Sequence, residues 1–327
     1  MPSEVPSFEP NQTLRGFEES VQQVKAEIGK VIVGQQAMIE LMIAAMLTQG
    51  HILIEGVPGV AKTLAAKLLA RCVAAGFSRI QFTPDLMPSD VLGTTVFNTQ
   101  KGDFDFRAGP IFSQLILIDE INRAPAKTQS ALFEVMEERQ VTMDGMRYPM
   151  AEPFMVMATQ NPIEQEGTYR LPEAQLDRFL FKIEVNYPSA EEELDMLGRF
   201  HGSSLDQRLA KVESVLSQSS IIELQEVVRQ LNVEPSLQRY VVDIVQRTRG
   251  HRDIYLGASP RATLNLLQAG KAIAAMRGRD FLTPEDVQFV AVPVLRHRIM
   301  LTPEKELEGG TATEVIRQLV QEVEVPR

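Results

Sequence analysis

A short segment near residue 55 combines the residue types that bind phosphate groups. Residues 51–56 are a short, mostly apolar run, and a loop with glycine and proline follows. Lys62 and Thr63 then open a stretch with a helical pattern. Backbone N–H groups of such a loop point at an anion, and the helix dipole favours negative charge there. Lys62 would reach the β- and γ-phosphates of a nucleotide, and the Thr63 hydroxyl would bind Mg²⁺.

One position of this loop departs from the usual pattern. Glycine usually precedes the lysine, and here the residue is Ala61. We expect a negative φ at Ala61, because it lies at a helix start, and a methyl group is tolerated with such a backbone. Lys62 and Thr63 are intact, so we expect the loop to bind ATP.

A pair of acids supplies the second signal. The run 115–118 is continuously apolar, as expected for a strand buried on both faces, and it ends in Asp119 and Glu120. Sheets of α/β proteins bind their ligands at the carboxyl ends of strands. Asp119 would hold Mg²⁺, mostly through water, and Glu120 would polarise the water that attacks the γ-phosphate. A solvated acidic pair is the alternative, and the phosphate loop favours catalysis over it.

Two more residues could serve the same reaction. Asn161 follows the apolar run 154–158, and an amide at a strand tip can orient the attacking water. The alternative is a turn asparagine before proline. Arg178 precedes the apolar run that begins at residue 179, and its alternative role is a surface ion pair with Asp177 or Glu173.

Arg261 is placed where a cation is unfavourable. Ser259 is expected to cap a helix, and Pro260 is its first residue. A cation in the first turn opposes the helix dipole. This arrangement indicates a bound anion, and a phosphate would fit; a chance surface position is the alternative.

The order of the elements predicts an α/β fold. Short apolar runs alternate with helical patterns up to about residue 187, which predicts a parallel sheet with helices on both sides. The runs are 52–55, 80–82, 115–118, 154–158 and 179–185. Residues 94–107 and 140–150 break this order, and turns at Lys101-Gly102-Asp103 and Asp144-Gly145 predict two inserted β-hairpins.

The chain is expected to divide near residue 187. Tyr187-Pro188-Ser189 marks the boundary, and Ser189-Ala-Glu-Glu192 is a capping box that opens a helix. Beyond it we expect a smaller all-α domain. Its helices are expected at about 190–200, 220–231, 236–249, 260–277 and 284–296. The predicted domains are therefore residues 1–187, with N-terminal helices and the sheet, and residues 188–327.

Composition limits the function classes. The 327 residues are 44% hydrophobic and 23% charged, which is typical of a soluble globular protein. The net charge of −10 argues against a protein built to bind nucleic acid. The four histidines show no metal-ligand spacing. The single Cys72 lies in an apolar stretch, so we expect a buried, inert thiol. Without a signal-peptide pattern or an apolar run of membrane-spanning length, we expect a cytoplasmic protein.

Taken together, these residues resemble the AAA+ ATPases over about residues 20–300. The resemblance comprises a Walker A loop (Gly56-Val-Pro-Gly-Val-Ala-Lys-Thr63), Walker B acids, a sensor 1 asparagine, an arginine finger at Arg178 and a sensor 2 arginine at Arg261. The two hairpins match the helix-2-insert clade. Three strings resemble the MoxR family within it, in which alanine before the lysine is common. They are Asp119-Glu-Ile-Asn-Arg-Ala-Pro125, Ala158-Thr-Gln-Asn-Pro162 and Leu171-Pro-Glu-Ala-Gln-Leu-Asp-Arg-Phe179.

The resemblance implies an AAA+ core with a five-stranded parallel sheet, followed by a helical lid. It implies ATP hydrolysis with Mg²⁺ in a ring, usually a hexamer, with ATP between the sheet domain and the lid at a subunit interface. Arg178, or Arg170 as a second candidate, would reach the neighbour's γ-phosphate, and Arg261 would act from the lid. Gln81 is a candidate for holding Glu120 inactive until a partner binds. The implied nucleotide-binding set is Val33, Gly34, Gly56, Val57, Pro58, Gly59, Val60, Ala61, Lys62, Thr63 and Leu64.

MoxR proteins are similar to chaperones that activate other proteins, often with a partner bearing a von Willebrand factor A domain. The resemblance therefore implies remodelling of a client protein. Three alternatives stay open: a scaffold that binds ATP without turnover, a magnesium-chelatase-like subunit, and a motor on nucleic acid. The last is disfavoured because Lys101, Arg107 and Arg147 on the hairpins are balanced by Asp103, Asp105 and Asp144.

Overall fold

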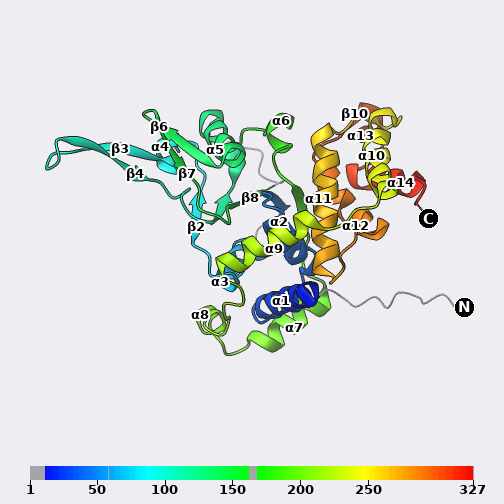
Figure 1. Cartoon of the computed structure of the whole chain (residues 1–327), viewed down its shortest axis with the longest axis horizontal. Helices are drawn as coiled ribbons and strands as arrows, with labels where there is room; N and C mark the ends of the chain where they lie inside the picture. The colour runs from blue at the N-terminus through cyan, green and yellow to red at the C-terminus, as the bar shows by residue number, and fades with distance from the viewer. Residues whose placement is uncertain (1–11, 58, 162–167, 327) are drawn as a thin grey trace, which may run out of the picture.

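The computed structural model describes residues 12–57, 59–161 and 168–326 (Figure 1). Its centre is a parallel five-stranded sheet with the order β2-β5-β8-β1-β9, as the alternation of apolar runs predicts. The strands are β1 (Ile52–Gly56), β2 (Phe77–Gln81), β5 (Leu115–Asp119), β8 (Met155–Gln160) and β9 (Phe181–Val185). All five therefore place their carboxyl ends at one edge of the sheet.

The continuous apolar run of β5 is explained by its central position. Leu115 and Leu117 point into one hydrophobic cluster, and Ile116 and Ile118 point into a second cluster on the opposite face. Successive side chains of a strand alternate between faces, so both sets must be apolar when helices cover both sides.

Different helices cover the two faces. The first cluster joins the sheet to α1 (Gln12–Gly29), α2 (Gln36–Leu47) and α3 (Lys62–Cys72), and continues into the C-terminal helices. The second cluster lies beneath α4 (Pro88–Leu92) and α5 (Ala126–Glu138). The short 3₁₀ helix η1 (Ile121–Arg123) follows β5, and α6 (Glu173–Leu176) precedes β9.

Both predicted hairpins are present. The first pairs β3 (Gly93–Asn98) with β4 (Asp103–Ala108), and the second pairs β6 (Gln140–Met143) with β7 (Met146–Pro149). The β3–β4 hairpin projects far from the rest of the molecule (Figure 1). Thr95 donates from Oγ1 to Asp144 Oδ2 at 2.6 Å, and the rings of Phe106 and Tyr148 stack at 4.2 Å. The two hairpins are thus in direct contact.

The C-terminal region is helical, as expected, with one difference. The helices are α7 (Ala190–Phe200), α8 (Leu205–Leu209), α9 (Gln218–Gln230), α10 (Pro235–Gly250), α11 (Pro260–Met276), α12 (Pro284–Leu295), α13 (Pro303–Leu307) and α14 (Ala312–Glu322). A two-stranded antiparallel sheet, β10 (Ile254–Leu256) with β11 (Met300–Leu301), interrupts them, so the expectation of an all-α region was wrong in this detail. These strands were missed because three and two residues are too few for a period of two to be visible.

The capping box that opens α7 is confirmed. Ser189 N donates to Glu192 Oε2 at 2.8 Å, and Glu192 N donates to Ser189 Oγ at 3.2 Å. The proposed domain boundary at residue 187 falls directly before this cap. Beyond it, α9 still contacts the N-terminal helices, because the Gln225 amide donates to the Met46 carbonyl oxygen at 2.8 Å. Among the described residues, no helix is both long and apolar enough to cross a membrane.

We predict that Leu117→Ala lowers the free energy of unfolding by about 2–5 kcal/mol, because the side chain is fully buried in β5 and its removal leaves a cavity. The matched control is Leu264→Ala on α11, where the side chain is 65% exposed and the expected change is within about 0.5 kcal/mol. Equilibrium urea unfolding measures both. Equal losses for the two variants would contradict the central position of β5.

Candidate nucleotide site

The loop between β1 and α3 is the core of the site. A Cβ atom at Gly56 would lie 2.6 Å from the carbonyl oxygen of Val185, so only glycine fits there. Gly59 has φ +88°, a conformation that also favours glycine. Val60 is buried, and Val57 and Leu64 are half-buried against the same core, so they anchor the loop. Pro58 lies outside the described residues.

The expectation for Ala61 was wrong. Its φ is +61° and its ψ is +20°, so it is left-handed, and it occupies the N-cap position of α3. This left-handed residue stands where the loop passes into the helix, directly before Lys62. An L-residue in this conformation costs roughly 1–2 kcal/mol. The alanine is therefore a strained residue within the phosphate loop.

Lys62 faces the acid pair. Its ammonium donates to the Gly56 carbonyl oxygen, so the side chain folds over its own loop. Burial lowers the pKa of Lys62, while the carboxylates of Asp119, Glu120 and Glu55 act in the opposite direction. The structure thus brings the loop lysine and both acids into one electrostatic environment at the carboxyl edge of the sheet.

Asp119 is nearly buried and has two partners. Its Oδ1 accepts a hydrogen bond from Thr159 Oγ1 at 3.2 Å, and its Oδ2 accepts one from Arg79 Nε at 2.6 Å. Neither partner was singled out from the sequence. Thr159 lies near the end of β8 and Arg79 lies on β2, the two strands that flank β5, so the strand order was needed to find them.

Glu120 is held in a strained backbone conformation with φ +58°. Its backbone N–H donates to Thr159 Oγ1 at 3.1 Å, and its Oε2 accepts from Gln81 Nε2 at 2.8 Å. Arg123 Nε also lies 3.3 Å from Oε2. Left-handed non-glycine residues persist only where the surroundings enforce them, and they cluster at functional sites. The expected contact between Gln81 and Glu120 is present in the structure.

Asn161 directly follows β8, which lies between β5 and β1 in the sheet. It is therefore at the same edge as the phosphate loop and the acids. The residues after it, 162–167, lie outside the described residues.

A cavity of about 570 Å³ adjoins the phosphate loop. The residues that line it are Gly59, Val60, Tyr187, Pro188, Glu193, Met196, Leu197, Phe200 and Arg208. Helix α7, which the structure describes in full, has no buried residue, and its apolar side chains face this cavity or solvent. The Arg208 guanidinium lies 4.1 Å from the centre of the Phe200 ring. This wall was not predicted from the sequence, although the apolar residues of α7 recur at helical spacing.

Val33 and Gly34 are near this wall without lining it. Gly34 has φ +71°, and a Cβ atom there would clash with the carboxylate of Glu192 on α7. Gln35 Nε2 donates to the Asn186 carbonyl oxygen at 3.1 Å. Neither Val33 nor Gly34 is among the described residues that line the cavity. Their predicted contact with the nucleotide stays a prediction.

Arg178 lies at the opposite edge of the sheet. It precedes β9, and Phe181 of β9 is aligned with Ile52, the first residue of β1. Five residues of strand, about 16 Å, separate this amino edge from the carboxyl edge. Arg178 Nε is 3.7 Å from Glu137 Oε2, so its partner is neither Asp177 nor Glu173. Arg170, the second candidate, is 85% exposed and pairs with Glu173 at 3.6 Å.

Arg261 lies beside Arg178. Both arginines pair with Glu137, and the Arg261 guanidinium makes a close hydrogen bond to it. Because α11 begins near the amino edge of the sheet, Arg261 lies away from the phosphate loop of its own chain, and its predicted role toward a bound phosphate stays a prediction. The anion indicated by the helix dipole is, in this subunit, the carboxylate of Glu137.

The start of α11 also differs from the expected cap. Ser259 occupies the N-cap position, but within the described chain its hydroxyl makes no capping bond. It donates instead to Asp177 Oδ2 at 3.0 Å. Asp177 precedes Arg178, so this bond ties the segment that carries Arg178 to the helix that carries Arg261.

A buried arginine completes this connection. Arg298, whose side chain is 1% exposed, donates from Nε to Asp177 Oδ1 at 2.7 Å and from Nη1 to the Leu180 carbonyl oxygen at 3.1 Å. Burial lowers the pKa of Arg298 to about 10, which still leaves it protonated at neutral pH. This residue could not be singled out from the sequence, because its partners Asp177 and Leu180 lie more than a hundred positions earlier in the chain.

The donor set fits Mg²⁺ bound together with phosphate. Thr63 and Asp119 offer hydroxyl and carboxylate oxygens, which are the ligands that Mg²⁺ prefers. Among the described residues, no group of three or more His, Cys, Asp or Glu side chains could hold a metal ion by itself. A metal here would therefore need phosphate oxygens and water to complete its shell.

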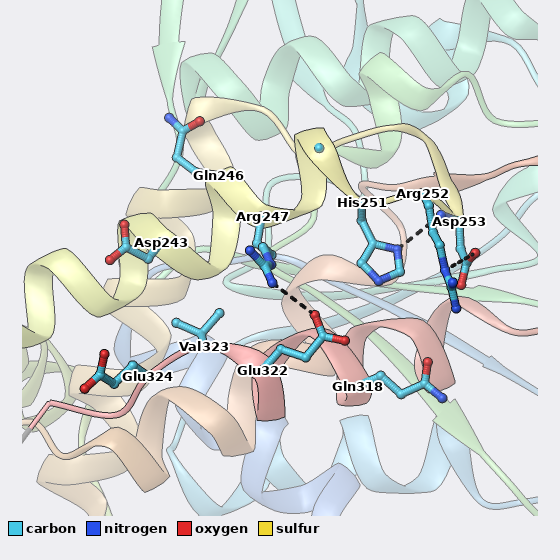
Figure 2. A pocket seen from close by; sticks show the side chains of 11 residues that line it. Asp243, Gln246, Arg247, His251, Arg252, Asp253, Gln318, Glu322, Val323 and Glu324 are labelled. Atoms are coloured by element: carbon cyan, nitrogen blue, oxygen red, sulfur yellow. Dashed lines mark hydrogen bonds and ion pairs between the residues drawn. The ribbon is translucent and has the colours of Figure 1, made fainter.

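A larger cavity, of about 930 Å³, lies elsewhere (Figure 2). It is formed by the end of α10, the loop 251–253 and the end of α14, among the C-terminal helices. Arg247 and Glu322 form an ion pair across it at 3.3 Å. Both acidic and basic side chains line it, and none of the predicted site residues does.

We predict that Ala61→Gly leaves the free energy of unfolding unchanged or raises it by up to about 1 kcal/mol. Glycine removes the left-handed strain, and the more flexible unfolded chain offsets part of this gain. The matched control is Ala65→Gly in the same helix, where a buried helix-interior position should cost about 1 kcal/mol. Urea unfolding compares the two, and equal destabilisation would contradict the positive φ of Ala61.

Comparison with known proteins identifies the family of the chain. Residues 51–181 match the model of the ATPase family associated with various cellular activities (AAA), and residues 246–319 match an AAA lid domain. The chain is 47% identical to the YeaC protein of Bacillus subtilis over 302 residues, which are 91% of this chain and 92% of that protein.

Two proteins with the MoxR name and one solved structure are similar over most of the chain. Chaperone MoxR1 of Mycobacterium tuberculosis is 47% identical, with 92% of this chain and 81% of that protein aligned. Protein MoxR of Methylorubrum extorquens is 30% identical over 96% and 97% of the two chains. A crystal structure from Cytophaga hutchinsonii, 42% identical, superposes with a TM-score of 0.89 over 97% of this chain and 98% of that one. From its fold, its site and these relatives, the chain belongs to the MoxR family of AAA+ ATPases.

Proposed function

We propose that this protein hydrolyses ATP with Mg²⁺. The observation that carries the proposal is the grouping of Lys62, Asp119 and Glu120 at the carboxyl edge of the sheet. Lys62 and the loop N–H groups bind the phosphates, and Thr63 and Asp119 hold the metal, whose chemistry is to neutralise phosphate charge. Glu120 polarises the attacking water, and Asn161 orients it.

The cavity beside α7 takes the nucleoside part of ATP. It opens directly from Gly59 and Val60 of the phosphate loop, so a nucleotide bound by its phosphates extends into it. Its wall combines the aromatic rings of Tyr187 and Phe200 with the apolar side chains of Met196 and Leu197, which suits a planar base.

The arginines act on a neighbouring subunit. Arg178 and Arg261 lie at the amino edge of the sheet, too far from the phosphate loop of the same chain. A ring in which one subunit's amino edge faces the next subunit's phosphate loop would place them on the γ-phosphate. We infer such a ring, with hexamer as its expected size, and Arg178 as the arginine finger.

ATP turnover in this ring serves the remodelling of a partner protein in the cytoplasm. The similar protein MoxR1 is named as a chaperone, which supports this proposal. The hairpins β3–β4 and β6–β7, which contact each other, would transmit motion to a client protein. A protein with a von Willebrand factor A domain is a candidate partner. A scaffold without turnover and a magnesium-chelatase-like subunit are the alternatives.

We predict that Arg178→Ala lowers kcat by about 10³-fold or more, as the loss of an arginine finger does. Lys62→Ala should be equally inactive because its phosphate loop is impaired. Mixing the two inactive proteins should restore part of the ATPase activity, since some interfaces then combine an intact loop with an intact arginine. Absence of recovery, in mixtures shown by mass photometry to form mixed oligomers, would place both residues in one subunit's site.

A second variant distinguishes an ATP-hydrolysing protein from a scaffold that binds ATP without turnover. Glu120→Gln should reduce kcat by about 10²–10⁴-fold while ATP binding, measured by calorimetry, stays intact, because the variant cannot polarise the attacking water. Glu134→Gln, on the exposed side of α5, is the matched control and should keep full activity. Unchanged turnover in Glu120→Gln would refute the assigned role of Glu120.

A further inference from the structure

One strand contacts both acids of the site. Strand β2 lies parallel to β5 at the edge of the sheet, with Arg79 aligned with Leu117 and Gln81 aligned with Asp119. Arg79 and Gln81 are two positions apart, so their side chains leave β2 on the same face. Arg79 contacts Asp119 at 2.6 Å, and Gln81 contacts Glu120 at 2.8 Å.

We propose that Arg79 is a metal-competing latch on Asp119. Its guanidinium occupies the carboxylate in the free subunit and leaves when Mg²⁺ enters with the nucleotide. This inference rests on the proposed function and deepens it, because it assigns regulation to the metal step of the same site. The contact of Arg79 with Asp119 is separate from the contact of Gln81 with Glu120, the acid that would polarise the attacking water.

Both oxygens of Asp119 already accept a hydrogen bond, so an incoming metal competes for the same carboxylate. Oδ1 is engaged by Thr159, and Oδ2 is engaged by Arg79. A metal ion, or a water in its first shell, needs an oxygen of this carboxylate. The guanidinium also places a unit positive charge beside the position of an incoming dication, and like charges at such a distance repel each other. The latch therefore opposes the metal both by occupancy and by charge.

Exposure decides which partner moves. The Asp119 side chain is 10% exposed, and its place is fixed by the end of a central strand. The Arg79 side chain is 54% exposed on an edge strand. A guanidinium that leaves Asp119 can be hydrated at once, so no buried donor remains unpaired. Arg79 can swing away while the strands keep their register.

The contact of Arg79 also reaches toward the second acid. Its Nη2 lies 3.5 Å from Gln81 Oε1, at the outer limit of a hydrogen bond, and Gln81 in turn donates to Glu120. Departure of Arg79 therefore removes one restraint from Gln81. Arrival of the metal at Asp119 and release of Glu120 would be coupled through these two neighbouring side chains.

The experiment measures metal affinity directly, with Mn²⁺ as the probe. Mn²⁺ is titrated by electron paramagnetic resonance into the full-length protein with saturating ADP. We expect Arg79→Ala to bind Mn²⁺ about tenfold more tightly than the unmodified protein, because occupancy and repulsion are both removed. Arg79→Gln, which removes the charge and keeps a polar side chain, should also tighten binding. Unchanged or weaker Mn²⁺ affinity in both variants would overturn the latch.

Two measurements separate this proposal from the proposed function. Arg123→Ala is the matched control, since Arg123 lies 3.3 Å from Glu120, and its Mn²⁺ affinity should stay within about twofold of the unmodified protein. Tightening in Arg123→Ala equal to that in Arg79→Ala would reduce the effect to general surface charge and refute the latch. ADP binding is measured without metal by a fluorescent analogue. Absence of ADP binding in the unmodified protein would overturn the nucleotide site itself and the latch with it.

Discussion

The rest of the structure depends on the parallel orientation of the five strands. Parallel strands send all of their carboxyl ends to one edge of the sheet and all of their amino ends to the other. The phosphate loop, the acids and Asn161 each follow a strand, so they meet at the first edge. Arg178 precedes a strand, so it must lie at the second edge. The two sets of residues are about 16 Å of strand apart. They are the two half-sites of the ring that we propose, in which association of subunits would join them.

The second half-site is built by contacts between the sheet and the C-terminal helices. Arg298 holds the Asp177 segment, and Ser259 at the start of α11 bonds to the same carboxylate. Glu137 then binds Arg178 and Arg261 together. Removing Arg298 would leave Asp177 without this partner, so the contact links the Asp177 segment to the C-terminal helices. The two arginines are consequently presented as a pair, and any movement of α11 against the sheet changes both.

Strand β2, at the edge of the sheet beside the acids, both contacts the acids and leads into the first hairpin. Strand β2 restrains both acids through Arg79 and Gln81. The same strand runs through α4 into the projecting β3–β4 hairpin, which touches the second hairpin through Phe106 and Tyr148. An edge strand has only one neighbour in the sheet, so it can shift at lower cost than a central one. This segment therefore connects the hairpins directly to the strand that contacts the acids.

The sequence by itself determined the fold class, the five strands, both hairpins and the positions of the loop and acid residues. These features are set by local patterns: apolar runs, glycine-containing turns, helix caps and a lysine after a glycine-rich loop. Only the tertiary structure decided the conformation of Ala61, which is left-handed at the N-cap of α3. It alone also decided the partners of Arg261 and Arg298, which lie 124 and 121 residues away from them in the chain. Such pairings follow from how distant segments pack, and neither propensity nor spacing along the chain encodes that packing.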